Sequence, residues 1–294
     1  MAALLAGSCV GPRAGDPRPP VAVVRPIPPA PQQRVTLPPA PARFAFEGAF
    51  AQGGLVLGTA PIGTRGVRLD GEAIELAPDR RFVIAFDRDA SPTARVEAEL
   101  DDGRVITETL SIAPGGWRIE NVNASPTGGA SSAEFRRRRA GELAQIGAAR
   151  AKVTGAQGWR QRFIWPVAGR QSGLFGAQRV YRGQPGSFHS GADVAAVTGT
   201  PVRAPADGVV VLAAAAPFTL EGNLLLIDHG MGVNSALLHL SRIDVREGQP
   251  VRQGEIVGAV GATGRASGPH MHWGLKWRAA RIDPAKVAGP VPPR

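Results

Sequence analysis

Two histidines near the C-terminal end of the chain have a spacing that suits a metal centre. His270 and His272 are separated by a single residue. Because side chains alternate faces along an extended segment, the two imidazoles would point to the same side. Imidazole nitrogen is a common ligand of Zn²⁺. A bare His-x-His pair also arises by chance, so the interpretation needs a second signal.

The second signal lies upstream, where His189 and Asp193 stand four residues apart in a glycine-containing loop. Catalytic zinc sites keep three protein ligands, which include imidazole nitrogen and carboxylate oxygen, and leave one position for water or substrate. His189, Asp193 and one of the two later histidines would complete such a set. Taken alone, a His-x3-Asp pair is often only a surface feature or a hydrogen bond.

A further histidine, His239, lies in the strand-like run of residues 235–240, so four of the five histidines fall in this run or in the two motifs. These residues, in this order, resemble the lysostaphin/LytM-type zinc metallopeptidases of family M23, which cut peptidoglycan cross-bridges. The resemblance covers about residues 163–285 and includes scaffold motifs. These motifs are residues 172–176, 199–210, 228–232 and 251–258.

The resemblance implies roles for individual residues. His189, Asp193 and His272 would hold Zn²⁺, whereas His239 and His270 would stay off the metal and handle protons. An imidazole pKa near neutrality suits either proton acceptance or donation, and which histidine is the general base stays open. The implied activity is that of a zinc metalloendopeptidase, a hydrolase that cuts peptide cross-links of bacterial peptidoglycan in cell-wall remodelling.

One residue departs from the family pattern. Family members usually have Tyr two residues before the histidine that matches His239, and this chain has Leu237 there. A Tyr at that position is thought to help stabilise the oxyanion. The departure therefore concerns transition-state stabilisation and not the metal ligands.

The composition favours a β-rich fold. The 294 residues include 38 glycines and 27 prolines but only 5% aromatic residues, a balance that favours many turns and short strands over long helices. We predict a mainly β protein with an N-terminal small β-sandwich-like domain and a helical connector. From the resemblance we expect a C-terminal LytM-type antiparallel β domain.

The formal net charge of +10 comes mostly from arginine. A basic surface attracts polyanions such as nucleic acid, acidic lipid headgroups or cell-wall polymers. The chain has no basic stretch interleaved with aromatic residues of the RNA-binding kind, so we predict no nucleic-acid partner. The four arginines at 136–139 are interpreted as a solvated helix face.

Residues 1–42 are predicted to be an export leader followed by a Pro-rich tether. The first nine residues end in Cys9 after small residues, which resembles a bacterial lipoprotein signal without its basic n-region. A lipid anchor at Cys9 would make the protein a periplasmic or outer-membrane lipoprotein of the cell envelope. Another exported leader or a chance pattern are the alternatives. The prolines of residues 10–42 favour an extended, semi-rigid segment.

Residues 43–114 show alternating apolar runs separated by turn signals. Asp70-Gly71 and Asp102-Gly103 stand between such runs and predict hairpins. The segment contains no His or Cys, so we expect a spacer or binding module and not a second active site. Its exact role is left open.

Residues 115–160 are predicted to connect this domain to the next. Ser131 and Glu134 form a capping-box pattern, and apolar residues at helical spacing predict a helix over about 132–153.

The final domain, residues 161–288, is again predicted to consist of strands and turns. In it a hairpin is expected around residues 229–232, with His229 at the turn in a structural role.

On the second strand of that hairpin, period two places Ser235, Leu237 and His239 on one face. We expect this face to look into the groove that contains His270 and His272.

Three other functions compete with the peptidase interpretation. The main one is a catalytically inactive LytM-type regulator or wall-binding scaffold, which would usually lack one or more metal ligands. A biotinyl- or lipoyl-carrier-like barrel would need a lysine at an exposed hairpin tip, and none of the three lysines is so placed. A zinc peptidase with a protein substrate, and an activating protein partner, both stay open.

Overall fold

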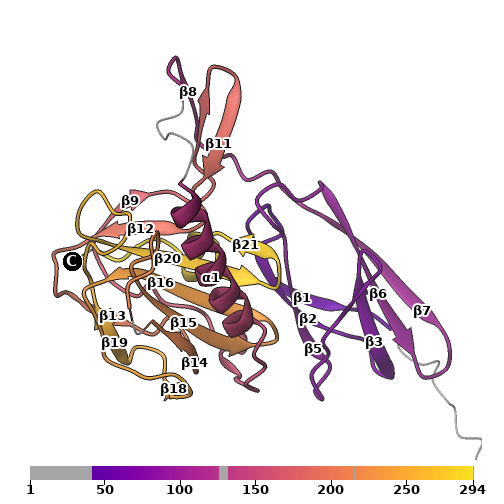
Figure 1. The fold of residues 1–294 in the computed structure, drawn as a ribbon. Coiled ribbons are helices and arrows are strands. Elements are labelled where there is room, and N and C mark those ends of the chain that lie inside the picture. Colours follow the sequence, from indigo (N-terminus) through magenta and orange to yellow (C-terminus); the bar gives the residue numbers. More distant parts are fainter. Residues whose placement is uncertain (1–41, 126–131, 215, 294) are drawn as a thin grey trace, which may run out of the picture. The chain divides into compact units, whose positions relative to one another are not determined.

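The computed structural model describes residues 42–125, 132–214 and 216–293. The predicted leader and tether, including Cys9, lie outside the described residues except for residue 42. Residues Pro41–Arg294 form one unit, which is described here. Its described part consists mainly of antiparallel strands and has two α-helices (Figure 1), which confirms the predicted β-rich fold class.

Strands β1 to β7 form two antiparallel sheets, in the orders β1-β2-β5 and β4-β3-β6-β7. In β6 the buried residues Ala94, Val96, Ala98 and Leu100 alternate with more exposed ones, the period-two pattern of a strand with one face in a core. The bounds are β1 (Ala45–Gly48), β2 (Leu55–Thr59), β3 (Thr64–Leu69), β4 (Glu72–Ile74), β5 (Arg81–Ala85), β6 (Thr93–Leu100) and β7 (Val105–Ser111).

The largest sheet has the order β18-β14-β15-β16-β20-β12-β9, with β21 paired to β20. All of its pairs are antiparallel. The bounds are β9 (Arg170–Gly173), β12 (Ala192–Ala195), β14 (Gly208–Ala213), β15 (Asn223–Gly230), β16 (Val233–Leu240), β18 (Pro250–Val251), β20 (His270–Trp277) and β21 (Ala280–Ile282).

Two small sheets complete the strands of the described residues. Their orders are β13-β19-β17 and β11-β10-β8, and β8 pairs with β10 in parallel. The bounds are β8 (Ile119–Val122), β10 (Gln178–Tyr181), β11 (Gln184–Phe188), β13 (Pro201–Arg203), β17 (Arg242–Ile243) and β19 (Ile256–Ala259); the helices are α1 (Ala133–Arg150), the 3₁₀ turn η1 (Gly158–Arg160) and α2 (Pro284–Ala288).

Two-residue turns close two of the three predicted hairpins. Asp70 and Gly71 have φ of 48° and 85°, and Met231 and Gly232 have φ of 52° and 78°. Two successive positive φ values are typical of a type I′ turn, whose twist matches that of the flanking strands. The first turn joins β3 to β4 at the predicted Asp70-Gly71. The second joins β15 to β16 and takes only the last two residues of the predicted range 229–232.

The two faces of the largest sheet differ in what covers them. Leu225, Leu237 and Trp273 are fully buried in the main core on one face. On the opposite face Leu226 and Ala236 join a second apolar cluster, to which α1 contributes Ile146 and Ala149. Helix α1 therefore packs on the face opposite the main core.

Helix α1 begins one residue later than predicted and ends three residues earlier. Its N-cap is Ser132, whose hydroxyl oxygen accepts a hydrogen bond from the Phe135 N–H at 3.0 Å. Ser131, the predicted cap, lies outside the described residues. The helix ends at Arg150 instead of 153.

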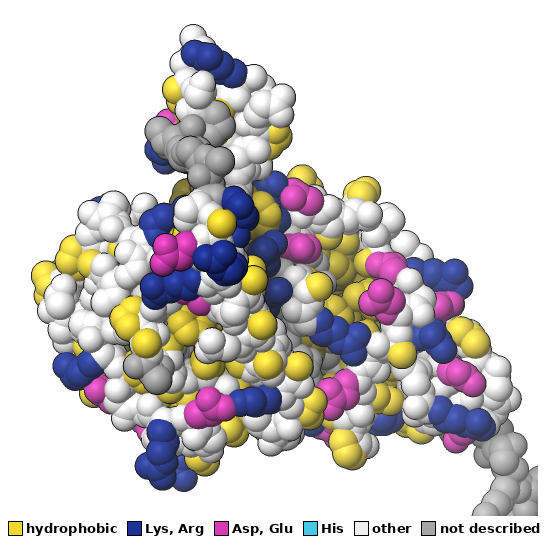
Figure 2. Space-filling view, in the orientation of Figure 1, with side chains coloured by type: hydrophobic (Ala, Val, Ile, Leu, Met, Phe, Trp, Pro, Cys, Tyr) yellow, Lys and Arg dark blue, Asp and Glu magenta, His cyan; other side chains and the backbone are white. Residues whose placement is uncertain are grey.

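The arginine run on α1 is only partly the solvated face that we expected. Figure 2 shows Lys and Arg side chains gathered over the N-terminal half of this helix. Arg139, however, is half-buried and donates two hydrogen bonds of 2.6 Å to the Glu221 carboxylate. Glu142 accepts from the N–H and the hydroxyl of Thr219 at 2.7 and 2.6 Å. These polar contacts tie α1 to the segment before β15.

His229 lies inside strand β15 and is fully buried, so the prediction that it sits at the turn was wrong. Its Nδ1–H donates to the Asp207 carbonyl at 2.8 Å, and its Nε2 therefore accepts from the Ser235 hydroxyl at 2.8 Å. The same hydroxyl oxygen accepts from Trp273 Nε1 at 3.1 Å. This chain of hydrogen bonds links β15, β16 and β20 through a neutral imidazole.

Burial lowers the pKa of His229 to about 4, against the hydrogen bond to Asp207 and the charge of Asp228. Since unfolding returns the pKa to about 6.5, the unfolded chain binds more protons between pH 6.5 and 4, and stability falls as the pH falls through that window. In the parent, the free energy of unfolding should fall by about 3 kcal/mol between pH 6.5 and 4 because of His229, and we expect His229→Asn to abolish this fall. Urea unfolding of both metal-free proteins between pH 4 and 7.5 measures it. An unchanged pH slope in the variant would contradict the assignment.

Candidate metal centre

The two predicted metal motifs meet at one point. His189 Nε2 lies 3.1 Å from Asp193 Oδ1 and 3.1 Å from His272 Nδ1, and His272 Nδ1 lies 2.8 Å from Asp193 Oδ1. Among the described residues these three form the one group of His, Cys, Asp and Glu whose ligand atoms lie close enough to hold a metal ion. Three ligand atoms from distant parts of the chain therefore converge.

Strand pairing brings Asp193 and His272 together. Asp193 on β12 is directly opposite His272 on β20, and directly opposed residues of an antiparallel pair share a face. Their neighbours Val194 and Met271 are buried in the main core on the other face. The apolar residues thus fix the register that puts both polar side chains on the same side of the sheet.

Two glycines let the backbone approach the ligands. A Cβ at Gly173 would lie 2.3 Å from Asp193 Oδ2, and a Cβ at Gly191 would lie 2.6 Å from His272 Nε2. Both distances are far below van der Waals contact, so a side chain at either position would displace a ligand. Both positions need glycine because of this close approach and not because of their backbone angles.

The orientation of His189 is set by a backbone carbonyl. Its Nδ1–H donates to the Leu174 carbonyl at 3.0 Å, which leaves the lone pair of Nε2 directed at the other two ligand atoms. Metal-binding histidines commonly use their second nitrogen in this way, because the hydrogen bond fixes both tautomer and ring orientation.

His239 and His270 stand beside the three ligand residues, with ring centres 4.8 Å apart. His239 donates from Nδ1 to the Thr263 carbonyl, and His270 donates from Nδ1 to the Gly268 carbonyl, both at 2.8 Å. The Nε2 atom of each ring is then the proton acceptor. His270 Nε2 lies 3.8 Å from Asp193 Oδ1, so this acceptor borders the metal group.

A β-bulge in β16, which the sequence did not predict, brings His239 to the face of the sheet that carries the metal group. We expected Ser235, Leu237 and His239 to share the groove face, and this was wrong for the first two. Leu237 is fully buried in the main core, and Leu238, opposite His272, borders the groove instead. The β15–β16 register shifts by one residue near Leu238, and His239 has a φ of 61°. The bulge turns His239 onto the opposite face from Leu237.

This geometry also bears on the missing Tyr of the family pattern. The side chain at position 237 packs in the core and not against the metal group. The expected loss of an oxyanion partner at this position therefore has no support in the local structure, since Leu237 points away from the groove.

The electrostatics of the site favour an ionised Asp193 carboxylate beside an uncharged His239, whereas the hydrogen bond and charge of Asp193 raise the pKa of His189 against its burial. Burial raises the Asp193 pKa, but the hydrogen bonds and charges of His189 and His272 outweigh it and hold that pKa well below its usual range. Burial lowers the pKa of His239, and the neighbouring His270 and His272 add to this effect against its hydrogen bond to Thr263. At neutral pH Asp193 is thus an anion and His239 an uncharged acceptor.

The five residues line an open groove of about 590 Å³. Residues 265–270 form one side of this groove, and Phe188, Leu220 and Leu238 contribute apolar surface. A groove of this kind exposes the converging ligand atoms to an extended substrate.

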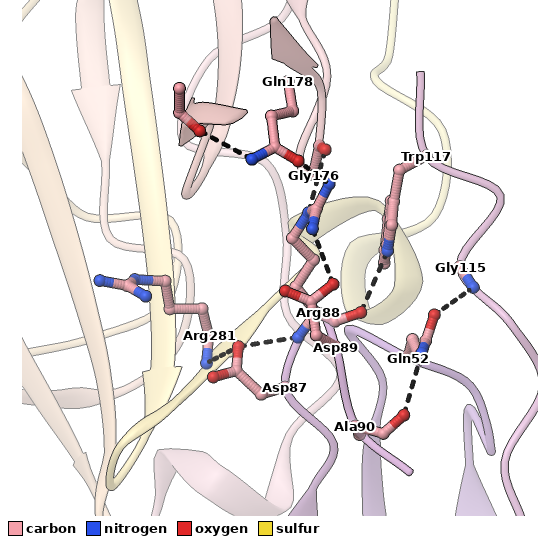
Figure 3. Close-up of polar contacts among 11 residues, drawn as sticks. Gln52, Asp87, Arg88, Asp89, Ala90, Gly115, Trp117, Gly176, Gln178 and Arg281 are labelled. Atoms are coloured by element: carbon pink, nitrogen blue, oxygen red, sulfur yellow. Dashed lines mark hydrogen bonds and ion pairs between the residues drawn. The ribbon is translucent and has the colours of Figure 1, made fainter. Parts of the chain in front are cut away.

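Arg88, from the turn after β5, holds the segment that leads to the metal group (Figure 3). Its buried guanidinium donates to the Gly176 carbonyl at 3.1 Å and to Gln178 Oε1 at 2.9 Å, and lies 4.7 Å from the centre of the Phe188 ring. The Gly176 N–H in turn donates to the His189 carbonyl at 2.8 Å. Nothing in the sequence around Arg88 indicated this contact, because it joins residues 88 positions apart.

Comparison with known proteins identifies the family. The profile of Peptidase family M23 matches residues 187–284, which include all five residues of the site. A candidate M23 peptidase of known structure from Pseudomonas aeruginosa is 30% identical; the match covers 82% of this chain and 95% of that chain, with a TM-score of 0.63. The chain belongs to peptidase family M23. The resemblance drawn from the sequence is confirmed.

Curated relatives match little more than a third of this chain. DD-carboxypeptidase/endopeptidase Mpg of Neisseria meningitidis serogroup B is 43% identical over 105 residues, which are 36% of this chain and 24% of Mpg. Peptidoglycan DD-endopeptidase ShyA of Vibrio cholerae is 41% identical over 103 residues, which are 35% of this chain and 24% of ShyA. The chain thus spans about a quarter of the length of these relatives.

Sequence reasoning singled out the five side chains that meet at this groove but not the groups that orient them. The carbonyls of Leu174, Thr263 and Gly268 carry no side-chain signal, so composition and motif spacing could not reveal them. Of the two glycines, Gly173 belongs to a scaffold motif that the sequence had marked, but its contact with Asp193 emerges only from the fold.

Removing the Arg88 side chain should loosen the metal group. We expect Arg88→Ala to lower the free energy of unfolding by about 3 kcal/mol, because two carbonyl acceptors lose a buried charged donor. Zinc affinity should fall as well, since the segment that holds His189 is no longer braced. Urea unfolding and zinc titration measure the two effects.

The matched control is Arg95→Ala in the same group of strands. Arg95 is exposed and pairs with Glu97 at the surface, so its loss should cost less than about 1 kcal/mol and leave zinc affinity unchanged. Equal effects of the two substitutions would refute a bracing role for Arg88.

Proposed function

We propose that the chain is a zinc-dependent endopeptidase that hydrolyses peptide cross-links of bacterial peptidoglycan. One observation carries this proposal: the ligand atoms of His189, Asp193 and His272 converge to 2.8–3.1 Å beside the imidazoles of His239 and His270. Three nitrogen and oxygen ligands on an open groove are what a catalytic zinc site requires.

The donor set fits zinc better than the other common divalent metals. Two imidazoles and one carboxylate suit a borderline-soft ion, whereas Mg²⁺ and Ca²⁺ prefer oxygen ligands. Tetrahedral coordination at about 2.0–2.1 Å places ligand atoms about 3.3 Å apart, close to the separations observed here. A bound Zn²⁺ would supply Lewis-acid chemistry, by lowering the pKa of water and polarising a peptide carbonyl.

His239 and His270 would move the protons of the reaction. Each has its Nδ1–H engaged by a carbonyl, so each presents Nε2 as an acceptor towards the groove. One would take the proton of the attacking water, and one would return a proton to the leaving amine. The two rings are equivalent in these hydrogen bonds, so the order of their roles stays open.

The names of the relatives support peptidoglycan as the substrate class. ShyA is named as a peptidoglycan DD-endopeptidase and Mpg as a DD-carboxypeptidase/endopeptidase. An open groove suits a peptide attached to a polymer better than a closed pocket would. The competing proposal is an inactive regulator or wall-binding scaffold on the same fold. Such proteins usually lose a metal ligand, whereas this chain keeps all three.

A peptidoglycan hydrolase would work in the cell envelope, and we propose that location. No helix in the described ranges is both long and apolar enough to cross a membrane. Lipidation of Cys9 remains a prediction, as does the division at residues 42, 114 and 160. Within that division, residues 43–114 would be a spacer or binding module, and residues 161–288 would be the M23 domain.

Single substitutions should separate metal binding from proton transfer. We expect His189→Ala, Asp193→Ala and His272→Ala to lose both zinc and hydrolysis. His239→Ala and His270→Ala should keep the metal and lose a factor of about 10² to 10⁴ in turnover, the range typical of general acid–base groups. Metal analysis of the purified variants decides this, and zinc missing from His239→Ala would overturn the assignment.

Isolated peptidoglycan sacculi provide the direct test of activity. We expect the zinc-loaded chain to release soluble fragments with cut peptide cross-links, and a chelator to stop the release. Mass spectrometry of the fragments identifies the bond. Full metal loading without any cleavage would favour the inactive regulator instead.

A further inference from the structure

Three cationic side chains gather beside the metal group on the same face of the sheet. Lys276 lies on β20, where alternation places it on the same face as His270 and His272. Arg281 on β21 is directly opposite Lys276. Arg150 is the last residue of α1, the helix that packs on this face.

Charges of the same sign directly opposite in a β-ladder destabilise it. Lys276 and Arg281 are such a pair, and Arg150 adds a third positive charge close to both. Burial lowers the Lys276 pKa, and the charges of Arg150 and Arg281 lower it further. Burial likewise lowers the pKa of Arg150, and Arg281 adds to the effect. The arrangement costs stability unless an anion joins it.

No acidic side chain of the described residues forms an ion pair with these three cations. Two carboxylates lie near them, and both are already bound. Glu221 takes two hydrogen bonds from Arg139. Asp87 accepts the backbone N–H groups of Arg88 and Arg281, and Figure 3 shows the Arg281 guanidinium turned away from it.

The guanidinium of Arg150 adds an independent observation. Its Nε is buried and has no hydrogen-bond partner in the part of the chain that the structure describes. Leaving a buried charged donor unsatisfied is costly. Arg281 contacts the face of the Phe188 ring, 5.3 Å from its centre, which leaves its donors available as well.

These cations line a cavity of about 230 Å³ between α1, β20 and β21, which we name the cationic pocket. It shares Ser190, Glu221, Leu238 and His272 with the groove of the metal group. The cavity is too small for a folded partner or a polymer backbone, but it accommodates one side chain or chain end. Its opening towards the groove makes a substrate group the natural occupant.

We propose that the cationic pocket binds a carboxylate of the peptide substrate. This inference rests on the proposed function, since it assigns a second contact to the same substrate. Lys276 lies four residues beyond His272, about 13 Å along the strand at roughly 3.3 Å per residue. An extended peptide advances about 3.3–3.6 Å per residue, and His272 and Lys276 line the same cavity, so the bound carboxylate belongs to a residue within about four positions of the cut bond.

The test compares two synthetic cross-linked peptides, one with free carboxylates and one with these groups amidated. With the zinc-loaded full chain, we expect Lys276→Met to raise KM for the free-carboxylate peptide about tenfold, with kcat unchanged. KM for the amidated peptide should change less than about twofold, because the neutral amide lacks the negative charge that the cations of the pocket bind. Arg281→Ala should act in the same direction.

The matched control is Lys152→Met, which makes the same change of charge at the end of α1. Lys152 is exposed and pairs with Glu247, and it does not line the cationic pocket. KM of this control should stay at the parent value for both peptides. Thermal unfolding checks the fold, and Lys276→Met should unfold at a higher temperature than the parent because it relieves the repulsion.

Binding measured without turnover separates this proposal from the proposed function. In zinc-loaded His239→Ala, Lys276→Met should weaken binding of the free-carboxylate peptide about tenfold and leave the amidated peptide unaffected. Charge-dependent binding without cleavage by the parent would refute the peptidase and support the pocket. Cleavage with equal losses for both peptides, or with no loss for either, would overturn the pocket and leave the peptidase standing.

Discussion

The pairing of β12 with β20 is the constraint on which the site depends. It sets Asp193 opposite His272, and a slip of one residue would turn one of the two towards the core. The register is held from the far face, where Val194, Met271 and Trp273 are buried. Apolar burial on one side of the sheet is therefore what positions the polar chemistry on the other. His189 then needs only a short loop, oriented by the Leu174 carbonyl, to complete the group.

The sequence predicted the residues of the site better than their orientation. Residue type and spacing were sufficient to single out His189, Asp193 and the His-x-His pair, because in a strand the spacing of two residues determines whether their side chains share a face. The same rule failed at His239, where a bulge breaks the alternation. The turn at Asp70-Gly71 was predictable because both of its positions have positive φ, which Asp and Gly tolerate. The burial of His229 within β15 was not predictable, because it depends on hydrogen bonds to Asp207 and Ser235 in other segments of the chain.

Long-range contacts could not be predicted from the sequence for a different reason. The bond from Arg88 to Gly176 and the approach of Arg150 to Lys276 depend on how separately formed elements dock. Helix α1 has few buried apolar residues, chiefly Ile146 and Ala149. So narrow an apolar stripe gives the helix little buried surface, and polar contacts to Thr219 and Glu221 add to its attachment. Apolar periodicity cannot predict such contacts.

The strain at His239 and the repulsion around Lys276 have a common physical logic. A non-glycine residue at positive φ costs about 1–3 kcal/mol and persists only where its surroundings fix it. Here the His239 N–H donates to the Glu221 carbonyl at 2.9 Å, and its Nδ1 is held by Thr263. The cations are held likewise, by a ladder partner and by the docked helix. Both features concentrate on the one sheet face that the main core does not use. The apolar face can thus stabilise the fold while the opposite face retains unfavourable arrangements that a substrate can relieve.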